Sequence, residues 1–181
     1  FWCGHVLPGG TLRAPLAGLA RAQVVVLSRA DMADAPTRDD IRARVAELAP
    51  HAKWCEVSHT PRSLRNTRGD VEELQKLSGQ RVAAFCAIGN PAGFRHNLET
   101  LYSEIVAWKE FPDHHQFTRE DVEQLTIWAA DADYAICTRK DLVKLQIASL
   151  GKTPLWSVGV ELEFFTGEQE LREILLELEQ D

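Results

Sequence analysis

The sequence predicts an α/β fold in which helices flank a mainly parallel sheet, a Rossmann-like three-layer α/β/α arrangement. Short apolar runs of strand length alternate along the chain with segments that begin at helix-capping residues. Several of these runs are apolar without interruption, which is typical of strands that are covered on both faces. The chain has 181 residues, 45% of them hydrophobic, so it is large enough to bury a core.

The first elements follow this alternation. Residues 22–28 (AQVVVLS) are rich in valine and predict a buried strand. Thr37 is placed to cap a helix that runs to about Leu48 and ends before Pro50. Residues 53–57 (KWCEV) predict a second, short strand.

A basic loop is expected next, because Arg62, Arg65 and Arg68 lie in TPRSLRNTRGD. Clusters of this kind usually face solvent. Asp70 then predicts the cap of a helix over VEELQKL, and Gly79 predicts its end.

The second half of the chain gives the clearest pattern. Residues 81–88 (RVAAFCAI) are the strongest strand, and Asn90 followed by Pro91 predicts a capped helix start. Residues 105–111 predict a strand, and Thr118 predicts the cap of the helix after it. The next expected elements are a strand at 134–138, a short helix over KDLVKLQIA and a last strand at 155–162. An amphipathic helix is expected to close the chain, with Leu171, Ile174, Leu175 and Leu178 on one face. Thr166 and Gln169 have the spacing of a capping box at its start.

Polar motifs follow three of the predicted strands. They are GNP after 81–88, PDHH after 105–111 and TRKD after 134–138. Ligands of parallel α/β sheets collect beyond the carboxyl ends of the strands. Three polar loops at one edge therefore predict a site there.

Charge and cysteine content narrow the class of protein. The net charge of −7 argues against a general nucleic-acid-binding protein. The four cysteines (Cys3, Cys55, Cys86 and Cys137) form no CxxC pair, and buried free thiols are expected instead of a disulfide framework. No apolar run approaches the ~18 residues that span a bilayer. The chain begins with Phe1, which is typical of a piece of a longer protein.

Each motif allows more than one interpretation on its own residues. Asp113, His114 and His115 suit a metal site, acid–base catalysis or a polar turn. Asn90 suits an anion site or an ordinary helix cap, and Lys140 suits a phosphate contact or a solvated helix start. No GxxxxGK(S/T) pattern, the signature of a phosphate-binding P-loop, occurs in the 181 residues.

The order of the motifs is more specific than any one of them. LPGGTLRAPL, VVVLSRAD, AIGNPAGFRHNLETL, FPDHHQFTREDVEQL and CTRKDLVKL follow one another between residue 5 and about residue 160. This series closely resembles the C-terminal half of the tetraacyldisaccharide 4'-kinases of lipid A biosynthesis. The chain is thereby expected to be a fragment of a P-loop-type kinase that lacks the half carrying its Walker A motif.

The resemblance implies transfer of the γ-phosphoryl group of ATP, with Mg²⁺, to the 4'-hydroxyl of a tetraacyldisaccharide 1-phosphate, the lipid A precursor. It implies that the enzyme acts at the cytoplasmic face of the bacterial inner membrane. The N-terminal half would bind most of ATP and Mg²⁺ and make the peripheral membrane contacts. Residues 1–80 would be the remainder of the kinase core, and residues 81–181 a C-terminal α/β domain. The chain alone is expected to be inactive.

The resemblance also implies roles for single residues. His114 matches the histidine that works with an acid of the N-terminal half to activate the sugar hydroxyl. Arg13, Asn90, Asp113 and Lys140 match substrate or phosphate positions, and no metal ligand is expected in this chain.

Two residues depart from the family pattern. Ala14 stands where the pattern has Glu, and Arg139 replaces the Glu of TEKD. Both changes remove negative charge, so a non-catalytic module that contacts substrate or membrane is an alternative. A metallophosphoesterase of the DHH type is a weaker one, because its upstream DxD motif and its glycine-rich motif are missing.

Overall fold

A computed structural model describes residues 6, 12–101 and 103–179 of the chain. The chain forms two compact units. The terminal unit comprises Phe1–His59 and Leu162–Asp181, and the central unit comprises Thr60–Glu161. The boundaries of these two units differ from the division at residue 80 that the resemblance implies. That division concerns the domains of the family and not compact units of this chain, so it stays a prediction.

The terminal unit is built on a parallel strand pair. β1 (Val24–Ser28) pairs with the first part of β2 (Lys53–Arg65). The buried core beside this pair consists of Leu27, Ala30, Ile41 and Val45. The unit's helices are η1 (Leu16–Arg21), η2 (Ala30–Met32), α1 (Ala35–Leu48) and α5 (Glu168–Leu178).

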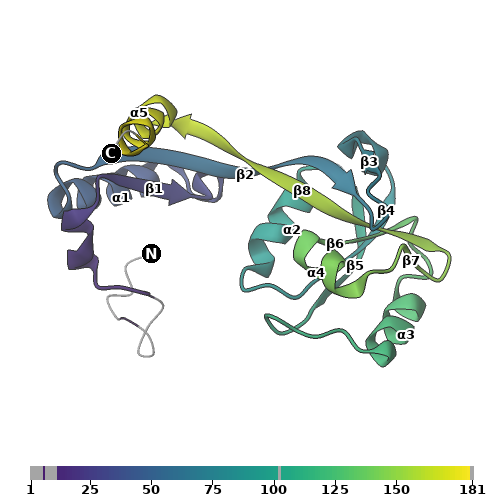
Figure 1. The fold of residues 1–181 in the computed structure, drawn as a ribbon. Coiled ribbons are helices and arrows are strands. Elements are labelled where there is room, and N and C mark those ends of the chain that lie inside the picture. Colours follow the sequence, from purple (N-terminus) through teal and green to yellow (C-terminus); the bar gives the residue numbers. More distant parts are fainter. Residues whose placement is uncertain (1–5, 7–11, 102, 180–181) are drawn as a thin grey trace. The chain divides into compact units, whose positions relative to one another are not determined.

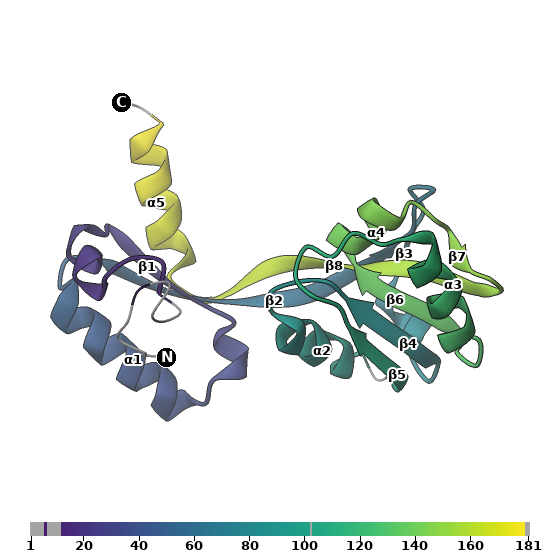
Figure 2. The ribbon, with the colours of Figure 1, turned by 90° about the horizontal axis from the view of Figure 1, so that it is seen from below.

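The central unit carries most strands of the single eight-stranded sheet (Figures 1 and 2). Its strands lie in the order β2-β8-β6-β4-β5, with β4 parallel to both of its neighbours and β6 parallel to β8. Short β3 pairs with β2, and β7 pairs with β8. The bounds are β3 (Val71–Glu72), β4 (Arg81–Cys86), β5 (Glu104–Glu110), β6 (Tyr134–Thr138), β7 (Ser149–Leu150) and β8 (Thr153–Thr166), with η3 (Leu74–Leu77), α2 (Pro91–Glu99), α3 (Arg119–Trp128) and α4 (Arg139–Leu145).

Alternate residues of β4 enter two separate hydrophobic clusters, because successive side chains of a strand point to opposite faces. Val82, Ala84 and Cys86 pack in a cluster with Phe94 and Leu98 of α2. Ala83 and Phe85 pack in the other cluster, together with apolar residues of α3 and α4. Helices therefore cover both faces of the sheet, and the predicted three-layer α/β arrangement is confirmed for this unit (Figure 2).

Most predicted elements of the second half are confirmed, with boundaries shifted by up to three residues, except that β8 continues four residues beyond its expected end at residue 162. The caps were predictable because they depend on local contacts. The Asn90 side chain accepts a hydrogen bond from the Gly93 N–H, and Thr118 forms a capping box with Asp121.

The predictions for residues 53–79 are partly wrong. The second strand does not stop at residue 57 but continues to Arg65, and β3 replaces the start of the expected helix. Asn66 explains the difference, since its side-chain oxygen accepts hydrogen bonds from the N–H groups of Arg68 and Asp70 while its amide donates to the Asp70 carboxylate. These bonds form a tight turn between β2 and β3, so Asp70 caps no helix.

Two other caps differ from the prediction. Asp34, and not Thr37, caps α1: its side chain accepts from the Thr37 N–H at 2.9 Å. The capping box of Thr166 and Gln169 is absent, because Gly167 is the first residue outside α5 and makes no side-chain cap.

The predicted amphipathic helix exists as α5, but part of its apolar stripe faces outward. Leu175 and Leu178 are 50% and 57% exposed. Within the described residues, no helix combines the length and the apolar character needed to cross a bilayer. The thiols of Cys55, Cys86 and Cys137 are buried and free, as predicted, whereas Cys3 and residues 7–11 of LPGGTLRAPL lie outside the described residues.

Candidate active site

The three polar loops meet at one edge of the central sheet, as their positions in the sequence predict. β5, β4 and β6 are adjacent and parallel, so the loops that follow them start side by side. They share a surface pocket of about 480 Å³. Its lining residues are Ala87 after β4, Asp113 and His114 after β5, and Arg139, Lys140, Val143 and Lys144 of α4.

His114 presents its imidazole to solvent at this pocket, with 81% of the side chain exposed. Its backbone is left-handed, with φ at 62°, a conformation that non-glycine residues adopt rarely and at some cost in energy. Its N–H donates to Asp113 Oδ1 at 3.0 Å, and its Nε2 lies 3.7 Å from Asp113 Oδ2. The turn therefore aims the imidazole outward, beside a carboxylate, where it can exchange a proton with a bound molecule.

Gly89 of the GNP motif allows the loop after β4 to approach Asp113. A Cβ atom at this position would lie 3.1 Å from Asp113 Oδ2 and 3.7 Å from its carboxyl carbon. Any side chain at residue 89 would thus press on the carboxylate next to His114. The GNP and PDHH motifs are packed against each other.

His115 belongs to the framework of the loop. Its Nε2 lies 2.9 Å from Asp121 Oδ2, and its ring stacks on Phe111 with a centroid separation of 4.8 Å. Lys144 donates to the His115 carbonyl at 3.2 Å, which ties the loop to α4. The two adjacent histidines therefore differ: one is held by the protein, and the other faces outward.

Asp121 links this loop to the start of α3. It accepts hydrogen bonds from the Thr118 N–H at 2.8 Å and the Thr118 hydroxyl at 2.9 Å, in addition to its contact with His115. These contacts, the Thr118 N–H first and His115 next, lower the pKa of Asp121 to about 2. The carboxylate is therefore charged across the physiological range.

Asp141, the acid of TRKD, is the buried anchor of the site. It is completely inaccessible to solvent, and its Oδ2 accepts from the Ala87 N–H at 3.1 Å and the Thr138 hydroxyl at 2.6 Å. Its Oδ1 has no hydrogen-bond partner within the described part of the chain, and Lys144 Nζ lies 3.7 Å away. Asp141 thus joins the end of β4 to the start of α4.

No role for Asp141 was predicted from the TRKD motif. The spacing of Thr138 and Asp141 is the signal that could have indicated a cap. The second contact, with Ala87, joins residues 54 positions apart and carries no local signal.

The predicted site residues are only partly brought together. Asp113, His114 and Lys140 line the same pocket. Asn90 does not line it; its side-chain oxygen accepts from the Gly93 N–H at 2.9 Å. Arg13 is exposed and belongs to the terminal unit, so its predicted contact with phosphate, like the other proposed roles, stays a prediction.

The geometry gives no support to a metal centre at DHH. Among the described residues, no three side chains of His, Cys, Asp or Glu gather closely enough to hold a metal ion. His115 in particular is already bonded to Asp121. The metallophosphoesterase interpretation therefore has no donor set in the described part of the chain.

These features define a class of protein: an α/β protein with an outward-facing imidazole, a neighbouring carboxylate and several cations at the carboxyl edge of a parallel sheet. The family model described as "LpxK: Tetraacyldisaccharide-1-P 4'-kinase" matches residues 1–180, and the chain belongs to this family.

Individual relatives carry the same name. A tetraacyldisaccharide 4'-kinase of Anaeromyxobacter sp. (strain Fw109-5) is 37% identical over 177 residues, which is 97% of this chain and 47% of that protein. One from Chelativorans sp. (strain BNC1) is 38% identical over 146 residues, 79% of this chain and 38% of that protein. The chain spans about half the length of such curated relatives.

A solved structure has the same fold. It is described as the "apo" form of LpxK from Aquifex aeolicus in complex with ATP, and it matches with a TM-score of 0.60 at 22% identity. The match covers 96% of this chain and 48% of that one.

Proposed function

We propose that this chain is the C-terminal part of a kinase that transfers the γ-phosphoryl group of ATP to the 4'-hydroxyl of a tetraacyldisaccharide 1-phosphate in lipid A biosynthesis. The observation that carries the proposal is the pocket that PDHH and TRKD share with Ala87 at the end of β4, with His114 facing outward. Membership of the family and the names of its curated relatives support the same reaction.

In this proposal His114 is the acid–base group. Its imidazole takes the proton of the 4'-hydroxyl as the sugar oxygen forms a bond to the γ-phosphorus and ADP leaves. Imidazoles are common general bases, and phosphoryl transfer otherwise depends mainly on positioning and charge stabilisation. The Asp113 carboxylate positions His114 by accepting a hydrogen bond from the His114 backbone N–H. Lys140 offers an ammonium group to phosphate oxygens.

ATP and Mg²⁺ belong to this proposal as ligands of the full-length protein. The ATP complex of the structurally similar Aquifex aeolicus protein supports a role for the nucleotide. The described residues offer no cluster of ligands for a metal ion, and the 181 residues contain no GxxxxGK(S/T) loop. We therefore assign most contacts to ATP and Mg²⁺ to the other half of the protein, and we expect this chain alone to be inactive.

The lipid substrate suggests where the protein works. We propose that the full-length protein acts at the cytoplasmic face of the inner membrane, with peripheral membrane contacts made mainly by its N-terminal region. The chemistry of a tetraacyl substrate supports this, because such a molecule resides in a bilayer.

A second candidate is a non-catalytic module that binds the acceptor without turnover. It is favoured by Arg139, which lines the pocket beside His114 where the family pattern has an acid. Ala14 is the other departure from that pattern.

The proposed reaction is tested by incubating the full-length protein, and separately this chain, with ATP, Mg²⁺ and tetraacyldisaccharide 1-phosphate. The full-length protein is expected to form the 1,4'-bisphosphate, detected by mass spectrometry and ³¹P NMR, and the chain alone to form none. Turnover by the chain alone would refute the assignment of most ATP and Mg²⁺ contacts to the other half of the protein. A full-length protein that binds the acceptor but forms no product would favour the non-catalytic module.

A further inference from the structure

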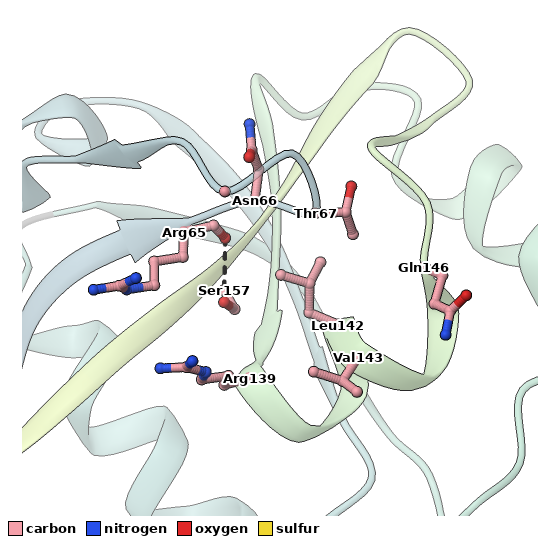
Figure 3. A pocket seen from close by; sticks show the side chains of 9 residues that line it. Arg65, Asn66, Thr67, Arg139, Leu142, Val143, Gln146 and Ser157 are labelled. Carbon is pink, nitrogen blue, oxygen red and sulfur yellow. Dashed lines mark hydrogen bonds between the residues drawn. The ribbon is translucent and has the colours of Figure 1, made fainter.

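A second pocket lies on the other side of α4 within the central unit. Its volume is about 530 Å³ (Figure 3). Arg139 and Val143 line both this pocket and the one that contains His114, so the two adjoin along α4. The full lining is Arg65, Asn66, Thr67, Gly69, Arg139, Leu142, Val143, Gln146 and Ser157.

The pocket has the charge of an anion site. It contains two arginines and no acidic side chain, in a protein with a net charge of −7. The guanidinium groups of Arg65 and Arg139 extend to the same side in Figure 3. Neither forms an ion pair with any residue that the structure describes. Two unpaired guanidinium forks match the oxygens of a phosphomonoester.

The framework around the two arginines is held by other residues. The Ser157 hydroxyl donates to the Arg65 carbonyl at 3.1 Å, as the dashed line in Figure 3 shows. Asn66 is occupied in the turn between β2 and β3, which fixes the backbone beside Thr67. Gln146 ends α4 in a left-handed conformation with φ at 52°. Thr67 and Gln146 therefore offer polar side chains at the rim of a preformed pocket.

We propose that this pocket binds the phosphate that the acceptor already carries, so that the acceptor spans the two adjoining pockets with its hydroxyl at His114. This inference rests on the proposed function, since the family description gives the acceptor as a 1-phosphate. Arg139 and Val143 line both pockets, so the proposed phosphate site directly adjoins the pocket that contains His114.

A binding experiment tests the subsite without requiring turnover. Glucosamine 1-phosphate, glucosamine and inorganic phosphate are each titrated by NMR into the full-length protein. The glycosyl phosphate is expected to bind more tightly than the other two. Arg65→Ala and Arg139→Ala should each weaken its binding about 10- to 100-fold, because each removes a charge-assisted contact.

Arg68→Ala is the matched control, because Arg68 lies in the turn next to the pocket but does not line it. This variant should bind as the wild type does. The inference is overturned if the glycosyl phosphate binds no more tightly than glucosamine, or if both pocket variants bind it normally. Equal affinity for inorganic phosphate would assign the pocket to a free anion and would overturn the assignment to the acceptor.

Steady-state kinetics separate this inference from the proposed function. Arg65→Ala and Arg139→Ala should raise KM for the acceptor and leave KM for ATP near the wild-type value. A rise in KM for ATP alone would assign the arginines to the nucleotide and contradict the inference. Wild-type activity with an unchanged acceptor KM in both variants would refute the subsite while the proposed function stands.

Discussion

Adjacent residues at the carboxyl edge of the sheet have opposite roles. His114 faces solvent in a left-handed conformation, whereas His115 is stacked on Phe111 and bonded to Asp121. Asp141 is buried below them and holds the start of α4 against the end of β4. The exposed group is the one available for chemistry, and the buried groups position the loops that carry it.

The role of Asp141 predicts a loss of stability when its carboxylate is removed. Asp141→Ala leaves the buried Ala87 N–H without its acceptor, which costs about 1–3 kcal/mol. Urea denaturation monitored by circular dichroism measures the free energy of unfolding. Asp131→Ala removes an exposed carboxylate and should change this free energy by less than about 0.5 kcal/mol. Equal stability of the two variants would contradict the anchoring role.

Asp121 predicts a dependence of stability on pH. Its pKa is about 2 in the folded protein, below the ordinary aspartate value of 3.8 that applies to the unfolded chain. The pKa is lowered because the Thr118 N–H and His115 stabilise the charged form. The group therefore stabilises the fold fully above pH 3.8, and this contribution is lost as the pH falls toward 2. Asp121→Asn should lower Tm at pH 7 and flatten the decline of Tm between pH 4 and pH 2.

Asp131→Asn serves as the comparison for the acid range, since Asp131 is exposed. Its decline of Tm should parallel that of the wild type. An unchanged slope in Asp121→Asn would show that Asp121 contributes nothing to the acid sensitivity.

At the scale of elements, the sequence was informative where a structure is decided locally. The helix starts at Asn90 and Thr118 follow from side chains that bond within three residues. The strand-like runs were found because a sheet that is covered on both faces needs continuous apolar residues. Local signals were misleading for residues 53–79, where pairing of β2 with β3 prevails over the helical pattern of VEELQKL.

The start of α5 was also unpredictable, because Gly167 is fixed by residues more than 100 positions away. It has φ at 82°, and an added Cβ would lie 2.4 Å from the Trp54 carbonyl oxygen and 2.6 Å from Cys55 Sγ. Its carbonyl accepts from the Cys55 thiol at 3.0 Å. Only glycine can lie this close to β2. A capping pattern, which is local in the sequence, contains no information about this distant contact.

Gly167→Ala should therefore destabilise the protein more than Gly79→Ala. Both glycines have positive φ, which costs alanine about 1–2 kcal/mol, but an added Cβ at Gly79 meets no atom within 4 Å. Overpacking against Trp54 and Cys55 adds about 1–3 kcal/mol at residue 167 only. Chemical denaturation of both variants measures the difference. Equal losses would contradict the close approach.

At the scale of the whole molecule, the sequence predicted the α/β class, the family and the meeting of three loops. The last prediction succeeded because parallel, adjacent strands place their carboxyl ends together, whatever separates them in the chain. The anion pocket around Arg65 was not predicted, because Arg65 was expected in a solvated loop. It lies at the end of a strand that was expected to stop eight residues earlier.

The central claim is that His114 is the acid–base group of a lipid A 4'-kinase. The most direct measurement is kcat of the full-length protein with His114→Ala, beside His51→Ala, which removes an exposed imidazole outside the pocket. We expect kcat to fall about 10²- to 10⁴-fold for His114→Ala and to remain near wild type for His51→Ala. A kcat for His114→Ala equal to that of the wild type would contradict the claim.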